Sequence, residues 1–199
     1  MTIRIDPMSR ADIPVVVLLQ TAFLDGSVVT QLGPGFLTRF HACALEHESV
    51  LAFVARGPDG AVAGFALASV DVDGFNRYVK PRVLLPLIRS LLSPARLGVM
   101  RSMVRTLVET GPSPHIPAEL LLLVVDPSAR RRGVGAALLK AIEEAFARVR
   151  LPRYRVAVRS HLEAARAFYV ALGFEHEQER LVLGRPMVYL TKRVNELSS

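Results

Sequence analysis

Residues 120–139 read LLLLVVDPSARRRGVGAALL, and this stretch decides the fold. It begins with an unbroken apolar run, Leu120 to Val125, which is typical of a strand buried on both faces of a sheet. Asp126-Pro127 ends the run, and beyond a glycine-containing loop the apolar residues recur at helical spacing as far as Val149. The stretch therefore predicts a central strand, a loop and a helix, in that order.

The loop carries three consecutive arginines, Arg130 to Arg132, directly before Gly133 and Gly135. Backbone N–H groups at a helix N-terminus bind anions, and glycine lets a phosphate approach the backbone closely. A P-loop would need Gly-Lys-Ser/Thr where Gly135-Ala136-Ala137 stands, and the dinucleotide fingerprint would need a third glycine in place of Leu138. The loop thus predicts an anion site of another kind.

The rest of the chain alternates strand and helix patterns around this centre. The predicted strands are 2–5, 50–55, 62–70, 120–125, 154–158, 181–183 and 187–190, with the last sheet region beginning at Phe174. The predicted helices are 9–24, 36–48, 134–149 and 162–172, with two further basic helices between 75 and 110. This order predicts an α/β (α+β) fold with a mixed central sheet of about six to seven strands and helices on both faces.

Length and composition predict one soluble domain. A chain of 199 residues with 51% hydrophobic residues suffices for one core, so we expect a single domain over 1–194 and a disordered tail over 195–199. No apolar run reaches ~20 residues, and Arg4 and Asp6 stand where a secretion signal would be apolar, which predicts a cytoplasmic protein. Cys43 lies on an apolar helix face and is expected in the core; Cys and His spacing predicts no metal site.

The positive charge is concentrated in one segment. Lys plus Arg exceeds Asp plus Glu by 25 − 18 = 7, and residues 75–108 hold seven basic and no acidic residues. We interpret residues 75–112 as a helical insertion before the central strand. It could bind a phosphorylated acceptor, contact an anionic membrane surface, form a homodimer contact, or simply cover the sheet. Nucleic acid is not expected, because Phe75 and Tyr78 alone offer stacking surfaces there.

The segment Arg130-Arg131-Arg132-Gly133-Val134-Gly135 resembles the acyl-CoA signature of the GNAT superfamily, Arg/Gln-x-x-Gly-x-Gly/Ala. A second block of that family is matched downstream by Val158, Ala165, Phe168-Tyr169 and Leu172-Gly173-Phe174. The sharp motifs extend from about Glu119 to Phe174, and the order of elements agrees over most of the chain. The resemblance implies a GNAT fold and acetyl-CoA as the cosubstrate.

The resemblance also implies where acetyl-CoA binds. In the family the central strand splays from its neighbour, its exposed backbone pairs with pantetheine, and the loop amides hold the pyrophosphate. The implied cofactor-binding residues are Leu123, Val124, Val125, Arg130, Arg131, Arg132, Gly133, Val134, Gly135, Ala136, Leu162 and Tyr169. Leu162 replaces the asparagine of many relatives, so a polar cofactor contact is missing there, which the neighbouring His161 could replace.

Three residues are implied to act in catalysis. Tyr169 occupies the position of the tyrosine that protonates the departing thiolate, and the N–H of Val125 could stabilise the oxyanion. Glu119 is placed like the general-base glutamate of the histone-acetylating branch. Two of them also have a structural explanation: Tyr169 as a packing aromatic, and Glu119 as a solvated strand end.

The resemblance predicts an N-acetyltransferase that moves an acetyl group to a primary amine by direct attack in a ternary complex. A small-molecule acceptor is expected, because a folded-down insertion would obstruct a peptide groove. The alternatives are a protein acetyltransferase acting on lysine or an amino terminus, and a non-catalytic CoA-binding module. The sequence identifies no acceptor.

Overall fold

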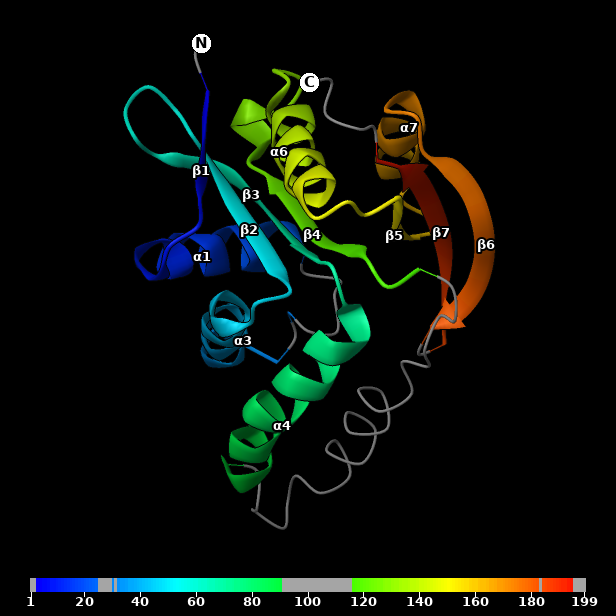
Figure 1. Ribbon diagram of the computed structural model, residues 1–199. Helices are drawn as coiled ribbons and strands as arrows, with labels where there is room; N and C mark the ends of the chain where they lie inside the picture. The colour runs from blue at the N-terminus through cyan, green and yellow to red at the C-terminus, as the bar shows by residue number, and fades with distance from the viewer. Residues whose placement is uncertain (1–2, 25–29, 31, 91–115, 183, 195–199) are drawn as a thin grey trace.

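The computed structural model describes residues 3–24, 30, 32–90, 116–182 and 184–194, with backbone alone for 84–90. The described residues form a seven-stranded mixed sheet in the order β1-β2-β3-β4-β5-β7-β6 (Figure 1). Adjacent strands are antiparallel except β4 and β5, which are parallel. The strands are β1 Arg4–Pro7, β2 Val50–Arg56, β3 Val62–Ser69, β4 Glu119–Val125, β5 Arg153–Arg159, β6 Glu175–Val182 and β7 Arg185–Arg193.

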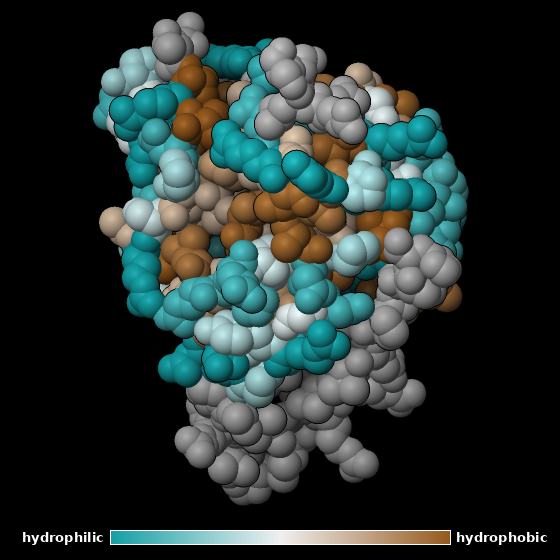
Figure 2. Space-filling model, in the orientation of Figure 1, coloured by the Kyte–Doolittle hydropathy of each residue, from teal (hydrophilic) through white to brown (hydrophobic). Residues whose placement is uncertain are grey.

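Helices cover both faces of the sheet, as the sequence predicts. The helix α6, on one face, packs over β2, β3 and β4, whereas α1 and α3 pack on the other face and α4 packs against α3 (Figure 1). The helices are α1 Ile13–Phe23, α3 Pro34–Glu46, α4 Val72–Ser90, α6 Val134–Arg148 and α7 Glu163–Ala171, with short 3-10 turns at Arg10–Asp12 and Pro127–Ala129. Hydrophobic residues, brown in Figure 2, gather in the middle of the face shown, and hydrophilic residues surround them.

Element types match the predictions and several boundaries differ. The first strand is Arg4–Pro7 rather than 2–5, because its pairing runs from Arg4↔Arg56 to Pro7↔Phe53. The helix α3 includes Pro34 in its first turn, where a missing N–H costs nothing, so the breaker lies at Gly33 with φ +90°. Cys43 lies on the buried side of α3, in the core, as predicted.

Of the predicted insertion, residues 75–112, the structure describes only residues 75–90. Its first helix, α4, begins at Val72, three residues before the predicted start. Phe75, Val79 and Val83 are buried from one side of α4, so this helix belongs to the core of the α1 and α3 face. The second predicted helix, after Ser93-Pro94, and the tail 195–199 lie outside the described residues.

The central strand separates from its parallel neighbour soon after it begins. β4 pairs with β5 at Glu119↔Arg155 and Leu120↔Val156, and the pairing ends there. On its other side β4 stays paired with β3 as far as Val125, with a register shift that leaves Leu121 unmatched between Leu120 and Leu122. The β5-facing backbone edge of β4 is therefore open from Leu121 onward.

Candidate active site

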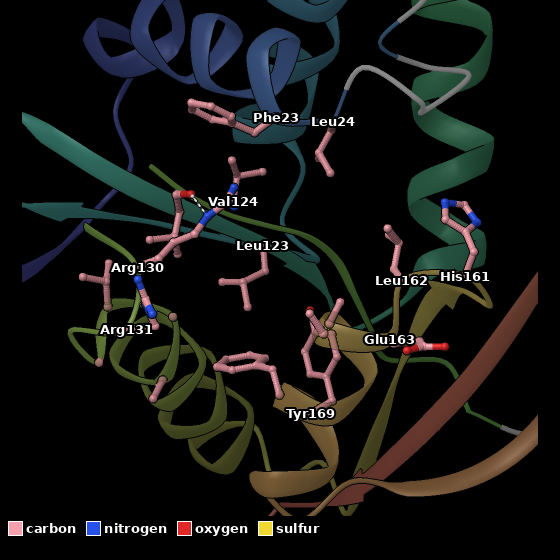
Figure 3. Close-up of a pocket in the computed structure, with 18 residues that line it drawn as sticks. Phe23, Leu24, Leu123, Val124, Arg130, Arg131, His161, Leu162, Glu163 and Tyr169 are labelled. Carbon is pink, nitrogen blue, oxygen red and sulfur yellow. Dashed lines mark hydrogen bonds between the residues drawn. The ribbon is translucent and has the colours of Figure 1, made fainter. Parts of the chain in front are cut away.

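A cavity of about 900 Å³ occupies the opening between β4 and β5. Its walls come from the end of β4, the loop and first turn of α6, the start of α7, and the end of α1 (Figure 3). Leu123, Val124 and Val125 supply the β4 wall, and His161 and Leu162 supply the wall that follows β5. The cavity brings an unpaired strand edge and a helix N-terminus into one space.

The N-terminus of α6 offers unsatisfied backbone donors. Gly133 is the N-cap with φ +79°, and the first intrahelical bond runs from the N–H of Ala137 to the carbonyl of Gly133. The amides of Val134, Gly135 and Ala136 precede that bond and have no helical carbonyl to donate to. They lie where the positive end of the helix dipole favours an anion. This turn is therefore a phosphate-binding geometry built from backbone.

The loop before α6 has a fixed shape. Asp126 Oδ1 accepts hydrogen bonds from the backbone N–H of Ser128 at 2.8 Å and from its hydroxyl at 2.6 Å, which closes the first turn. Arg131 has φ +59°, two residues before the left-handed Gly133. Left-handed residues interspersed in a loop aim successive N–H groups into one concave surface, which suits an anion. Arginine in that conformation is strained, so the surrounding loop must hold it there.

Arg130 extends across the mouth of the cavity. Its Nε donates to the Val125 carbonyl at 3.1 Å, and its guanidinium carbon lies 5.6 Å from the ring centre of Phe23 on α1 (Figure 3). The side chain therefore connects the end of β4 to the end of α1. Because Nε is used for the carbonyl, the two terminal nitrogens remain for a phosphate.

Tyr169 contributes a buried hydroxyl-bearing ring from α7. Its relative exposure is 7%, and Figure 3 shows it pointing from α7 into the cavity on the side of Leu123. Burial raises the pKa of Tyr169 above its ordinary value, so the phenol is protonated at neutral pH. The geometry supplies a proton donor inside an apolar wall.

The close approach of α6 to α7 depends on Gly135. A Cβ at this position would lie 3.1 Å from Cζ of Phe168 and 3.7 Å from Cγ2 of Val125. Phe168 itself lines the cavity beside Tyr169. A small residue is thus required where the helix N-terminus, the central strand and α7 meet.

Glu119 lies away from this cavity. It begins β4, six residues before Val125, which is ~20 Å along an extended strand. Its Oε2 accepts a hydrogen bond from Nε of Arg155 at 2.8 Å and forms an ion pair with Nη2 of the same guanidinium at 2.7 Å. Burial raises the pKa of Glu119, the Arg155 charge opposes this, and Asp73 adds to the rise. Glu119 is therefore half of an ion pair rather than a solvated strand end.

The structure brings most of the predicted site residues together. The predicted residues that line the cavity are Leu123, Val124, Val125, Arg130, Arg131, Gly133, Val134, Gly135, Ala136, Leu162 and Tyr169. Arg132 and Glu119 do not line it. Phe23 and Leu24 line the cavity and were not predicted, because nothing in the local sequence of a distant helix end indicates such a contact. Ala165 and Phe168 also line it, and their helical spacing to Tyr169 could have indicated this.

Neither a metal-binding cluster nor a membrane-spanning helix occurs within the described ranges. No three His, Cys, Asp or Glu residues among them are grouped so that they could hold a metal ion. No helix in the same part of the chain is long and apolar enough to cross a membrane.

Comparison with solved structures agrees with this geometry. SsHAT superposes with a TM-score of 0.71 at 20% identity, covering 98% of this chain and 100% of that one. PaiA N-acetyltransferase from Thermoplasma acidophilum, solved in complex with coenzyme A, gives a TM-score of 0.64 at 14% identity, covering 97% and 99%. Ard1 from Thermoplasma volcanium gives 0.63 at 20% identity, covering 98% and 100%. Likenesses at this level of identity establish the shared fold.

Sequence comparison identifies the family. No curated protein matches this chain. The acetyltransferase (GNAT) family matches residues 23–174, which include the β4 edge, the arginine loop, the first turn of α6 and Tyr169. Because this match spans most of the chain and the fold agrees, the protein belongs to the GNAT family of acetyltransferases and is an acyltransferase.

Proposed function

We propose that this protein transfers an acetyl group from acetyl-CoA to a primary amine of a small molecule. The observation that carries the proposal is the cavity in which the open edge of β4 meets the free amides of α6. An extended pantetheine arm contains two amides, which can hydrogen-bond to a strand edge as a further strand would. Its pyrophosphate then reaches the N-terminus of α6.

The reaction we propose is direct attack within a ternary complex. The amine nitrogen bonds to the thioester carbon to form a tetrahedral intermediate, which collapses as the C–S bond breaks and Tyr169 donates its proton to the departing sulfur. The proton that the amine nitrogen loses passes to water, and a proton from water returns the Tyr169 phenolate to the phenol. The N–H of Val125 stabilises the oxyanion of the tetrahedral intermediate. Both groups belong to the cavity wall, so they can act on one bound thioester.

The role of Glu119 as general base stays a prediction, and the distance from Glu119 to Val125 limits how it could act. With ~20 Å of strand between Glu119 and Val125, the carboxylate cannot contact an amine that attacks a carbonyl held at Val125. Proton transfer from the amine to Glu119 would require a chain of water molecules. A Glu119→Gln variant that keeps its turnover at high pH would show that the amine loses its proton elsewhere.

Cys43 has no part in this proposal, although an acyl-enzyme route would need a nucleophile. It lies on the buried side of α3 and does not line the cavity, and burial raises the pKa of its thiol. A folded Cys43→Ala variant should therefore keep its turnover. Loss of turnover with intact CoA binding would instead indicate an acyl-enzyme intermediate.

The experiment that tests the proposal is calorimetric titration with acetyl-CoA, followed by a screen of free amines and amine-bearing peptides for thiol release. Micromolar binding that weakens about tenfold or more in Arg130→Ala/Arg132→Ala is expected. The matched control is Lys140→Ala/Arg148→Ala, which also removes two positive charges but from exposed positions off the cavity. Equal weakening in both variants would mean that net charge, not the loop, attracts the cofactor.

The amine screen separates the acceptor classes. Thiol release with free amines supports the small-molecule proposal, and release with peptides alone would assign the protein-modifying alternative. Tight CoA binding without turnover on any amine would favour a non-catalytic CoA-binding module. Absence of CoA binding by the folded wild type would refute the proposed cofactor site.

A further inference from the structure

The parallel strands β4 and β5 diverge from one paired register. Glu119 and Arg155 lie opposite each other there, and the N–H of Arg155 donates to the carbonyl of Ala118 at 3.1 Å. Val125 lies six residues after Glu119, and His161 lies six residues after Arg155. If the pairing of β4 with β5 continued that far, these two residues would be neighbours ~4.8 Å apart. They instead line opposite walls of a cavity of about 900 Å³.

An ion pair joins the two strands at this register. Arg155 and Glu119 meet through Nη2–Oε2 at 2.7 Å and Nε–Oε2 at 2.8 Å, with side-chain exposures of 6% and 15%. It stands on the sheet face opposite α6, since the neighbouring Leu120 and Val156 point into the core beneath α6. Charges removed from water to this extent persist only when they are paired in a fixed geometry.

Arg155 is also held from its other side. Its guanidinium carbon lies 5.3 Å from the ring centre of Tyr189 on β7, which is the antiparallel neighbour of β5. The guanidinium is therefore fixed between a carboxylate on β4 and an aromatic face on β7. Its Nη1 is buried and has no hydrogen-bond partner among the described residues, so the contacts that orient the group run through Nε and Nη2 to Glu119.

We propose that the Glu119–Arg155 ion pair sets the angle between β4 and β5, and therefore the width of the acetyl-CoA cleft. Neither residue lines the cleft, so both act as positioning residues. A rotation of ~5° about this register moves the end of a ~20 Å strand arm by roughly 2 Å. Displacements of that size are enough to break hydrogen bonds between a strand edge and an extended ligand. The cofactor part of this inference rests on the proposed function.

The first measurement is acetyl-CoA affinity by calorimetry in Arg155→Met, Arg155→Lys and Glu119→Gln. Arg155→Met should raise the Kd about tenfold or more, whereas Arg155→Lys should raise it less because it keeps the charge. The control is Arg56→Met on β2, which breaks ion pairs to Asp12 (2.6 Å) and Asp6 (3.2 Å), none of which lines the cleft. Its Kd should stay within twofold of wild type, even if its Tm falls.

The second measurement does not depend on the cofactor. Spin labels are attached at Ser128→Cys and His161→Cys in a Cys43→Ala background. Double electron–electron resonance then reports the separation of the segments that follow β4 and β5. Arg155→Met should broaden or shift the distance distribution, and the reversed pair Glu119→Arg/Arg155→Glu should restore it. If Arg155→Met does not fold, the same distance measurement is made on Arg155→Lys and Glu119→Gln.

The outcomes separate this inference from the proposed function. An unchanged distance distribution together with an unchanged Kd in folded variants would refute the inference. A wild type that binds no acetyl-CoA would refute the proposed function while the distance measurement still decides the role of the ion pair. A Glu119→Gln variant with normal Kd and normal wall distance but slow turnover would assign Glu119 to proton transfer instead.

Discussion

Lys192 Nζ lies 2.6 Å from Glu143 Oε1, the same oxygen to which the hydroxyl of Tyr154 donates at 2.5 Å. This one carboxylate oxygen thus connects α6 to both β5 and β7. The ion pair is partly buried, with side-chain exposures of 18% for Lys192 and 22% for Glu143. These contacts hold α6, whose N-terminus forms the anion site, against β5 and β7 on the other side of the cleft.

Removing that carboxylate should destabilise the fold. We expect Glu143→Ala to lower the free energy of unfolding by ~2 kcal/mol, because it leaves a partly buried ammonium and a buried phenol without their acceptor. Urea unfolding measures this. Glu144→Ala, one residue along, breaks only an exposed 3.9 Å contact with Lys140 and should change stability by less than ~0.5 kcal/mol. Equal effects of the two substitutions would contradict the buried role of Glu143.

Gly64 should be as sensitive as the motif glycines, although it lies on β3. A Cβ there would stand 2.7 Å from the carbonyl oxygen of Val124, so Gly64→Ala must displace the end of β4. We expect acetyl-CoA affinity to fall along with stability. Gly35→Ala is the control, since a Cβ at Gly35 meets nothing within 4 Å and alanine favours the helix. Calorimetry and thermal unfolding of both variants give the comparison.

Tyr169→Phe should lower kcat about a hundredfold and leave acetyl-CoA affinity near wild type, because the ring remains and the proton is lost. Since burial raises the pKa of Tyr169, the phenol stays protonated as pH rises through 8 and 9, and the pH profile of kcat should show no loss from its ionisation there. Tyr78→Phe, which loses a partly exposed hydroxyl contact to Glu46, should keep full kcat. A wild-type kcat in Tyr169→Phe would assign Tyr169 to packing.

His41 should make the protein less stable in mild acid. It is fully buried, with Nε2 2.7 Å from Oε1 of Gln20, and burial lowers its pKa to about 4. The unfolded chain has the ordinary value of ~6.5, so between those two pH values the unfolded state binds the extra proton and stability falls as pH falls. The loss by pH 4 should approach ~3 kcal/mol.

The measurement for His41 is urea unfolding at a series of pH values. The double variant Gln20→Leu/His41→Leu removes both polar groups, including the unpaired Nδ1 of His41 and Nε2 of Gln20. Its stability should depend less on pH between pH 4 and 6.5. The same slope in the double variant would place the acid sensitivity in another group.

The sequence predicted the local elements well because their signals are local. The apolar run at Leu120, the glycine at 133 and the helical spacing to Tyr169 each depend on neighbouring residues, and the structure confirms the strand, the loop and both helices. The family motifs lie in the same stretch. That is why most of the predicted cofactor residues line one cavity.

Contacts between distant segments could not be predicted in this way. Nothing near Glu119 in the sequence indicates Arg155, which is brought opposite it by the parallel pairing of strands separated by α6. The contribution of Phe23 to the cavity wall depends likewise on how α1 crosses the sheet. Gly64 lies outside every motif, yet the carbonyl of Val124 limits its size.

The open edge of β4 has a consequence for how the family can diverge. If the cofactor is held as an added strand, the groups that recognise it are peptide N–H and C=O groups, which every residue except proline supplies. Exchanging Leu123 or Val124 for another strand-forming residue then alters shape but removes no hydrogen-bonding group. Recognition encoded in the main chain in this way tolerates extensive drift of side chains, so homologues can share little sequence and still bind one cofactor.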